Sequence, residues 1–195
     1  MPDLAMPDLA MSDLATTRSG AFDSFEASAK AASVEVAPPA ARFSFRGRPA
    51  AIDAAGAAFG VALPREACRA AVARDRAALW LGPDEWLLLA PDGAGEAIRW
   101  AFAESVAPLP HSLVDISHRN CALEIAGPKA EDLLNTGCPL DLTPGAFGIG
   151  MCARTLLGKA ESVLWRITPD RFRLEAWRSF GAYVWKYLEE ARRGV

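Results

Sequence analysis

The stretch Ser112–Gly137, SLVDISHRNCALEIAGPKAEDLLNTG, carries the strongest local structural signals in this chain. Apolar and polar residues alternate over residues 114–118 and again over 121–126, and this period of two predicts two β-strands. Gly127-Pro128 ends the second run, and the fixed φ angle of proline suits the first position of a helix. Leucines at helical spacing follow, and Gly137 can supply the left-handed residue that ends the helix. The stretch therefore predicts two strands followed by a short helix.

A similar order of signals occurs earlier in the chain. An alternating run at residues 42–46 precedes Gly47-Arg48-Pro49 and a helical pattern that ends at Gly60. Pro-Asp pairs at 83–84 and 169–170 lie between apolar runs, which is typical of hairpin turns. We therefore predict an α+β fold of two pseudo-repeated, ferredoxin-like lobes, about residues 41–108 and 111–193. Each lobe is expected to hold an antiparallel sheet covered by helices.

The first 40 residues differ in composition from the remainder of the 195-residue chain. Residues 1–15 are three near-copies of one pentapeptide, MPDLA MPDLA MSDLA, in which Met1, Met6 and Met11 are each a possible start. Such short polar repeats bury little apolar surface, so residues 1–40 are interpreted as a disordered low-complexity tail and linker. The folded domain is expected to span residues 41–195.

Charge and cysteine usage exclude several classes of partner. The formal net charge is −3, and the first 40 residues alone contribute six acidic and two basic side chains, so the remainder is nearly neutral. A nucleic-acid partner usually requires a concentrated basic excess, which is missing. No apolar run reaches the roughly 20 residues of a membrane helix. Four well-separated cysteines and two histidines predict reduced thiols in the cytoplasm, with no metal site.

The residues that could form a catalytic or cofactor site do not have the required spacing. Asp115, Ser117 and His118 lie within four residues, whereas a hydrolase triad is assembled from distant segments. Cys138 lacks a neighbouring base, and Gly148–Gly150 lacks the third glycine and the helix of a dinucleotide fingerprint. The residue pattern therefore predicts no catalytic, cofactor-binding or metal-binding residue in this chain.

Three tryptophans are predicted to lie off the core. The apolar stripe predicted for the last helix includes Tyr183 and Tyr187 and leaves out Trp185, and Trp100 likewise falls outside the stripe of its own helix. Trp177 falls on the strand face opposite Phe172 and Leu174. Because tryptophan is enriched in protein–protein interfaces, we predict that these three residues form a partner interface.

Several consecutive motifs resemble one known family in the same order. Asp115–Arg119 and Ala126–Ala130 resemble the opening of folate-dependent aminomethyltransferase domains such as the glycine-cleavage T-protein. A denser similarity, to the gamma subunit of heterotetrameric sarcosine oxidase, is carried by residues 137–142 (GCPLDL), 150–155 (GMCART), 157–161 (LGKAE) and 175–180 (EAWRSF). The similarity covers about residues 40–192 and leaves out the tail.

The resemblance implies a small subunit of a bacterial complex that oxidises sarcosine, or a related N-methyl amine, to glycine. Such a complex forms hydrogen peroxide and 5,10-methylenetetrahydrofolate. The resemblance also implies alpha, beta and delta subunits as partners. These subunits are expected to hold FAD, FMN, NAD, tetrahydrofolate and zinc, and this chain is expected to hold no cofactor. The chain has only Tyr183 and Tyr187, both in the closing helix, so no folate contact is transferred to it.

The resulting expectation is a non-catalytic, structural subunit that docks on the larger chains. Two alternatives remain open. One is an autonomous folate-binding module or aminomethyltransferase-like enzyme, and the other is an unrelated regulatory α+β dimer.

Overall fold

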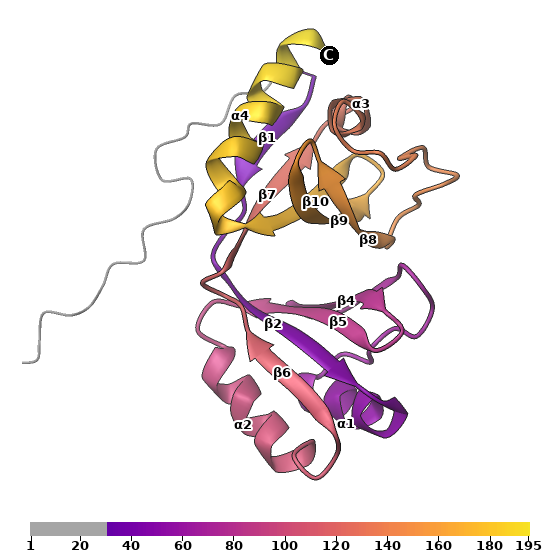
Figure 1. The fold of residues 1–195 in the computed structure, drawn as a ribbon. Helices are drawn as coiled ribbons and strands as arrows, with labels where there is room; N and C mark the ends of the chain where they lie inside the picture. The colour runs from indigo at the N-terminus through magenta and orange to yellow at the C-terminus, as the bar shows by residue number, and fades with distance from the viewer. Residues whose placement is uncertain (1–30) are drawn as a thin grey trace, which may run out of the picture.

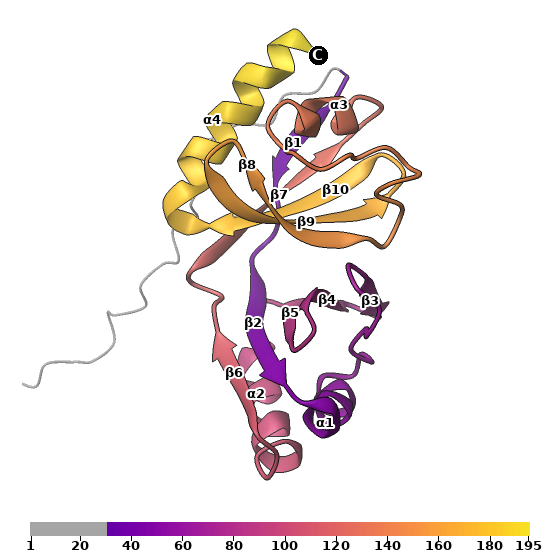
Figure 2. The ribbon, with the colours of Figure 1, turned by 45° about the vertical axis from the view of Figure 1, so that its right-hand side comes forward.

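The computed structural model describes residues 31–195, and the predicted disorder of the tail lies mostly outside this range. The described chain folds into two lobes, each with a five-stranded antiparallel sheet. The two sheets face each other across the centre of the molecule, and the helices cover their outer faces (Figures 1 and 2). The α+β class and the antiparallel sheets predicted from the sequence are both present.

The first lobe is built from one continuous segment. Its elements are β2 (Ala40–Gly47), α1 (Pro49–Phe59), β3 (Ala70–Ala73), β4 (Arg76–Gly82), β5 (Glu85–Pro91), α2 (Gly95–Ser105) and β6 (His111–Asp115). The strand order across the sheet is β3-β4-β5-β2-β6. Helices α1 and α2 pack on its outer face over a core that includes Phe43, Phe45 and Phe102.

The second lobe repeats this arrangement with one strand taken from the start of the described chain. Its elements are β1 (Ser33–Val36), β7 (Asn120–Ala126), α3 (Ala130–Asn135), β8 (Cys152–Leu157), β9 (Ala160–Thr168), β10 (Arg171–Trp177) and α4 (Gly181–Ala191). Two short 3₁₀ turns, η1 (Arg178–Phe180) and η2 (Arg192–Gly194), flank α4. The strand order is β1-β7-β10-β9-β8.

The two repeats exchange their first strands, and this corrects two predicted boundaries. Strand β1 precedes the first repeat but pairs with β7, whereas β6 precedes the second repeat but pairs with β2. The predicted linker to residue 40 therefore contains a strand, and residues 111–115 belong to the first sheet rather than to the second repeat. The sequence prediction failed here because strand periodicity identifies a strand but not its distant partner.

Gly127 shows why the exchanged strand fits where it does. Its φ angle is +120°, and a Cβ atom there would lie 2.7 Å from the main-chain oxygen of Ala31. Only glycine adopts this conformation without strain and leaves room for the incoming chain. The adjacent Lys129 N–H donates to that same oxygen at 3.1 Å, which anchors the segment leading into β1.

The loop between the first helix and the next strand differs between the lobes. In the first lobe it spans residues 60–69, and the indole N–H of Trp86 donates to the Pro64 carbonyl at 2.8 Å. In the second lobe it spans residues 136–151, and the buried Arg166 donates to the carbonyls of Leu142 and Phe147 at 2.9 and 2.7 Å.

A separate apolar cluster joins the lobes. It contains Leu79, Leu87 and Leu89 from the first sheet, Ile116 from the connection and Cys152 from the second sheet. Beside it, residues 68–70 and 150–152 form a short antiparallel bridge centred on Arg69 and Met151. The lobes therefore share an apolar contact surface and a backbone bridge.

Candidate functional site

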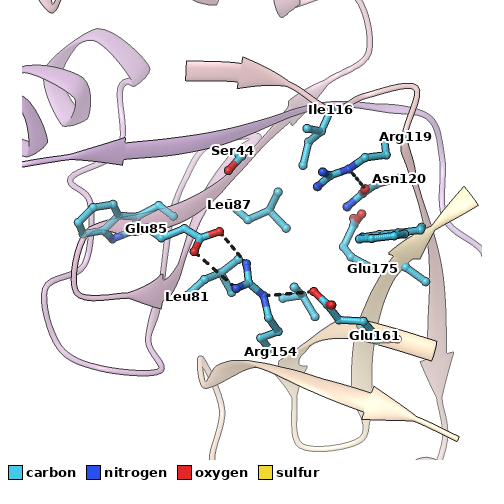
Figure 3. Close-up of a pocket in the computed structure, with 15 residues that line it drawn as sticks. Ser44, Leu81, Glu85, Leu87, Ile116, Arg119, Asn120, Arg154, Glu161 and Glu175 are labelled. Carbon is cyan, nitrogen blue, oxygen red and sulfur yellow. Dashed lines mark hydrogen bonds and ion pairs between the residues drawn. The ribbon is translucent and has the colours of Figure 1, made fainter. Parts of the chain in front are cut away.

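A small hollow lies between the two sheets (Figure 3). Its volume is about 40 Å³. Both lobes contribute to its lining: Ser44, Leu81, Glu85, Trp86, Leu87, Ile116, Arg119, Asn120, Arg154, Glu161, Ser162, Val163, Glu175, Ala176 and Trp177. A ligand pocket usually measures several hundred Å³, whereas this volume suits only one or a few water molecules.

An ion-pair cluster on one side of this cavity joins the lobes. Glu85 of β5 accepts from Arg154 of β8 at 2.6 Å and from Arg46 of β2 at 2.7 Å. Burial alone would raise the pKa of the Glu85 carboxyl, but the two guanidinium groups outweigh burial and lower it. Glu85 is therefore held ionised as a charged contact between the sheets.

A second ion pair lies deeper in the same interface. The guanidinium Nε of Arg42 donates to the Glu175 carboxylate at 2.6 Å, and both side chains are almost completely buried. Arg173 also contacts Glu175 at 2.8 Å. Two cations thus compensate one buried carboxylate, which makes this a structural contact between β2 and β10.

Asp115, the last residue of β6, is followed by a turn that contains Ser117 and His118, whereas the alternating pattern predicted a strand through residue 118. The Ser117 N–H donates to the Asp115 carboxylate at 2.9 Å. Burial opposes ionisation of Asp115, but hydrogen bonds from Ser117 and the charge of Arg99 lower its pKa. The Ser117 hydroxyl accepts from the main-chain N–H of Arg42 at 2.9 Å, so it holds the turn against β2.

Trp177 lies at the end of β10, on the rim of the cavity, and its side chain is 40% exposed. The guanidinium of Arg119 lies over its ring at 5.6 Å from the centroid, and the Phe180 ring is 6.4 Å away. The combination of a partly exposed tryptophan and an overlying arginine is typical of interface hot spots. We call Trp177, Arg119 and Phe180 the rim patch.

Trp100 lies on the outer face of α2 and is 64% exposed. It lines an open surface hollow of about 520 Å³ together with Glu96, Arg99, Ala103 and Glu104. The sequence-based placement of this tryptophan outside the core is therefore correct.

The prediction that Trp185 lies off the core is wrong. It is only 4% exposed and belongs to the core of the second lobe. The buried stripe of α4 consists of Gly181, Val184, Trp185 and Leu188, whereas the sequence prediction assigned Tyr183 and Tyr187 to it. The two tyrosines instead lie at the edge of the helix, where the Tyr187 hydroxyl donates to the Thr136 carbonyl at 2.8 Å.

The thiols of Cys138 and Cys121 lie in environments that do not activate a nucleophile. Cys138 is buried beside the Thr155 hydroxyl, and burial together with nearby Glu175 raises the pKa of Cys121 to about 11.

Within residues 31–195, no group of three or more histidine, cysteine or acidic side chains is arranged to hold a metal ion. None of the helices in this part of the chain is long and apolar enough to cross a membrane.

Sequence reasoning missed the charged residues that join the lobes. Glu175 stands between Leu174 and Ala176 in a strand, and Arg42 begins the alternating run of β2. A charge inside an apolar strand was the available signal, but its partner lies 133 residues away in the chain. Periodicity cannot supply that pairing.

Comparison with known proteins places the chain in a family. The sequence profile of the sarcosine oxidase, gamma subunit family matches residues 46–193. The chain belongs to this family. Curated members include the gamma subunit from Arthrobacter sp, 41% identical over 58% of this chain and 55% of that protein. The gamma subunit from Corynebacterium sp. (strain P-1) is 36% identical over 69% of this chain and 66% of its own length.

The chain thus spans about half to two thirds of these two family members. Among solved structures, the heterotetrameric sarcosine oxidase from Corynebacterium sp. U-96 in complex with pyrrole 2-carboxylate contains a chain with a TM-score of 0.76 and 28% identity. The match covers 85% of this chain and 86% of that one. The glycine cleavage system aminomethyltransferase T from Bartonella henselae has a TM-score of 0.59 at 12% identity, covering 80% of this chain and 44% of that one, so it shares the T-protein-like fold.

Proposed function

We propose that this chain is a structural, non-catalytic gamma subunit of a heterotetrameric sarcosine oxidase. The observation that carries this proposal is the match over 85% of the chain to a chain of a heterotetrameric sarcosine oxidase, together with membership of the gamma subunit family. The assembled enzyme oxidises sarcosine to glycine, reduces oxygen to hydrogen peroxide and forms 5,10-methylenetetrahydrofolate. The proposal places this chain in the cytoplasm with alpha, beta and delta subunits as its partners.

In this proposal the FAD, FMN, NAD, tetrahydrofolate and zinc of the complex reside in the other subunits. The geometry of this chain supports that division of labour. The hollow shown in Figure 3 has a volume of about 40 Å³. Of the carboxylates that line it, Glu85 pairs with Arg154 and Glu175 pairs with Arg42, each across the interface between the lobes. The first lobe is also interpreted as ferredoxin-like, because β2, α1, β4, β5, α2 and β6 follow the β-α-β-β-α-β order. In the second lobe, β1 takes the place of the last strand of that order.

The docking function is assigned to the rim patch and to the Trp100 surface. Both present a large aromatic side chain to solvent beside an arginine, and burying such a ring in a partner releases much apolar surface from water. Trp185 is removed from the predicted interface because it fills the core of the second lobe.

The proposal is tested by co-expressing the full chain with the alpha, beta and delta subunits and measuring complex recovery and affinity. We expect Trp177→Ala to weaken association by about tenfold or more, since hot-spot truncations cost upwards of about 1.4 kcal/mol. Trp100→Ala is expected to weaken it less, because its ring lacks an overlying cation. Leu156→Ala, at an exposed apolar residue on β8, is the matched control and should bind normally. Unchanged association of both tryptophan variants would contradict the assigned docking surface.

The alternative, an autonomous folate-binding module or aminomethyltransferase-like enzyme, makes a different prediction. Tetrahydrofolate added to the isolated full chain would then quench tryptophan fluorescence saturably at micromolar concentration. The structural proposal predicts no saturable quenching, and a bound folate would overturn it.

A further inference from the structure

We propose that Cys68 and Cys152 form a peroxide-sensitive pair that closes into a disulfide and covalently joins the two lobes. The inference concerns a modification site of this chain and goes beyond the proposed docking function. Cys68 lies in the loop of the first lobe just before β3, and Cys152 begins β8 of the second lobe. Both thiols are free in the structure.

The backbone places these two residues directly opposite each other. The antiparallel bridge centred on Arg69 and Met151 makes Cys68 the next partner of Cys152, and the Cys152 N–H donates to the Cys68 carbonyl at 2.9 Å. In a regular antiparallel ladder, residues at such opposed positions have Cα atoms about 4.5 to 5.5 Å apart. Disulfides require Cα separations of roughly 4.4 to 6.8 Å, so the bridge already holds the two residues within reach.

Cys68 also acts electrostatically on Cys152. Burial in the first place and the neighbouring Cys68 in the second raise the pKa of the Cys152 thiol to about 12. This effect agrees with the backbone geometry, because two charges interact appreciably only when they are close together.

Cys68 and Cys152 differ in solvent accessibility, and this difference sets the order in which they react. Cys152 is completely buried, whereas Cys68 is partly exposed beside the positively charged Arg69. A peroxide therefore reaches Cys68 first, where the thiolate attacks the peroxide oxygen, breaks the O–O bond and yields a sulfenic acid and water. The Cys152 thiol then attacks the Cys68 sulfur, forms the S–S bond and releases a second water molecule. Overall, two thiols and one hydrogen peroxide give one disulfide and two waters.

Cys68 occupies a position where the backbone is already unusual. Its φ angle is +59°, in the left-handed region that non-glycine residues seldom adopt. Such conformations persist where the surrounding structure imposes them and are concentrated at functional positions. The strained residue here belongs to one of the segments that hold the lobes together.

The test treats the folded full chain with hydrogen peroxide, blocks the remaining thiols and maps tryptic peptides by mass spectrometry. We expect residues 66–69 to be linked to residues 130–154, with two hydrogens lost, and the link to disappear on reduction. Because Cys138 lies in the second peptide, Cys138→Ser is the matched control and must retain the link. Cys68→Ser must lose it, and this exposed substitution avoids disturbing the core.

A time course of sulfenic acid labelling and a thermal unfolding measurement complete the test. A sulfenic acid trap should label Cys68 early in the reaction, because the high pKa of Cys152 makes the second step slow. The oxidised chain should unfold at a temperature about 5 to 10 °C higher than the reduced chain, reversibly with dithiothreitol. Overoxidation of Cys68 without linkage, or a link involving Cys121, would overturn the proposal. Neither result would bear on subunit docking, so the two proposals fail separately.

Discussion

The two lobes share a topology but hold the loop after their first helix by different chemistry. The first lobe has a ten-residue loop, at 60–69, that receives one hydrogen bond from the neutral indole of Trp86. The second lobe has a sixteen-residue loop, at 136–151, that wraps around the guanidinium of Arg166, a side chain only 2% exposed. A longer loop with little regular structure turns more carbonyl groups inward, and one guanidinium supplies several donors to them.

Burying a cation requires compensation, and the second lobe provides it from several directions. Glu131 of α3 pairs with Arg166 at 2.9 Å, and the Pro169 carbonyl accepts at 2.8 Å. The Phe172 ring lies 4.7 Å from the guanidinium carbon. One repeat can therefore hold this loop with a neutral donor and the other with a buried cation, provided that every donor of the cation has an acceptor.

Breaking the charged anchor should have the largest effect. We expect Arg166→Met to lower the free energy of unfolding by about 3 to 5 kcal/mol, because several buried carbonyls and Glu131 lose their partner. Denaturant unfolding of the full chain measures this loss, and Arg166→Lys should fall between wild type and Arg166→Met. The more exposed pair of Arg171 with Glu124 is the control, and Arg171→Met should cost less than about 1 kcal/mol. Equal losses for the two methionine variants would refute the special role of Arg166.

Breaking the neutral anchor should cost less. Trp86→Phe removes the indole donor to the Pro64 carbonyl and leaves a small void, for an expected loss of about 1 to 3 kcal/mol. The same substitution at the exposed Trp100 should change stability by less than about 0.5 kcal/mol. If Trp86→Phe proved more damaging than Arg166→Met in the same unfolding experiment, the contrast between the lobes would be reversed.

The smallest expected effect is the pH dependence of the stability that Glu85 contributes at the junction of the lobes. The pKa of Glu85 is lowered in the folded chain, so its contribution is complete above its ordinary pKa of 4.5. The contribution is lost as the pH falls through the folded value, because protonation discharges the contact with Arg154 and Arg46. Unfolding curves from pH 7 to pH 3 should show a stability gap between wild type and Glu85→Gln that narrows below about pH 4.5. A gap independent of pH would show that charge at Glu85 contributes nothing.

Local patterns predicted much of the fold. The Gly-Pro signal at 127–128 lies two residues before the start of α3 at Ala130, and Gly60 correctly located the end of α1. Sequence signals failed where long-range pairing decided the outcome, as in the exchange of β1 and β6. They failed again in α4, where two large tyrosines shifted the inferred apolar stripe away from Trp185.

The candidate site was predictable only in part. Exposure of Trp100 and Trp177 followed from local periodicity, since both lie opposite an apolar face. The Arg42–Glu175 and Glu85–Arg154 contacts did not, because each depends on two lobes meeting face to face. The Cys68–Cys152 juxtaposition has the same origin.

The exchanged first strands have a consequence for biosynthesis. Strand β1 leaves the ribosome before its partner β7, with more than eighty residues between them. At translation speeds of about 5 to 20 residues per second, β1 waits for several seconds with an unpaired edge. The contiguous lobe at 40–115 can close during that time, whereas the distal lobe is completed only by a segment synthesised before either sheet exists.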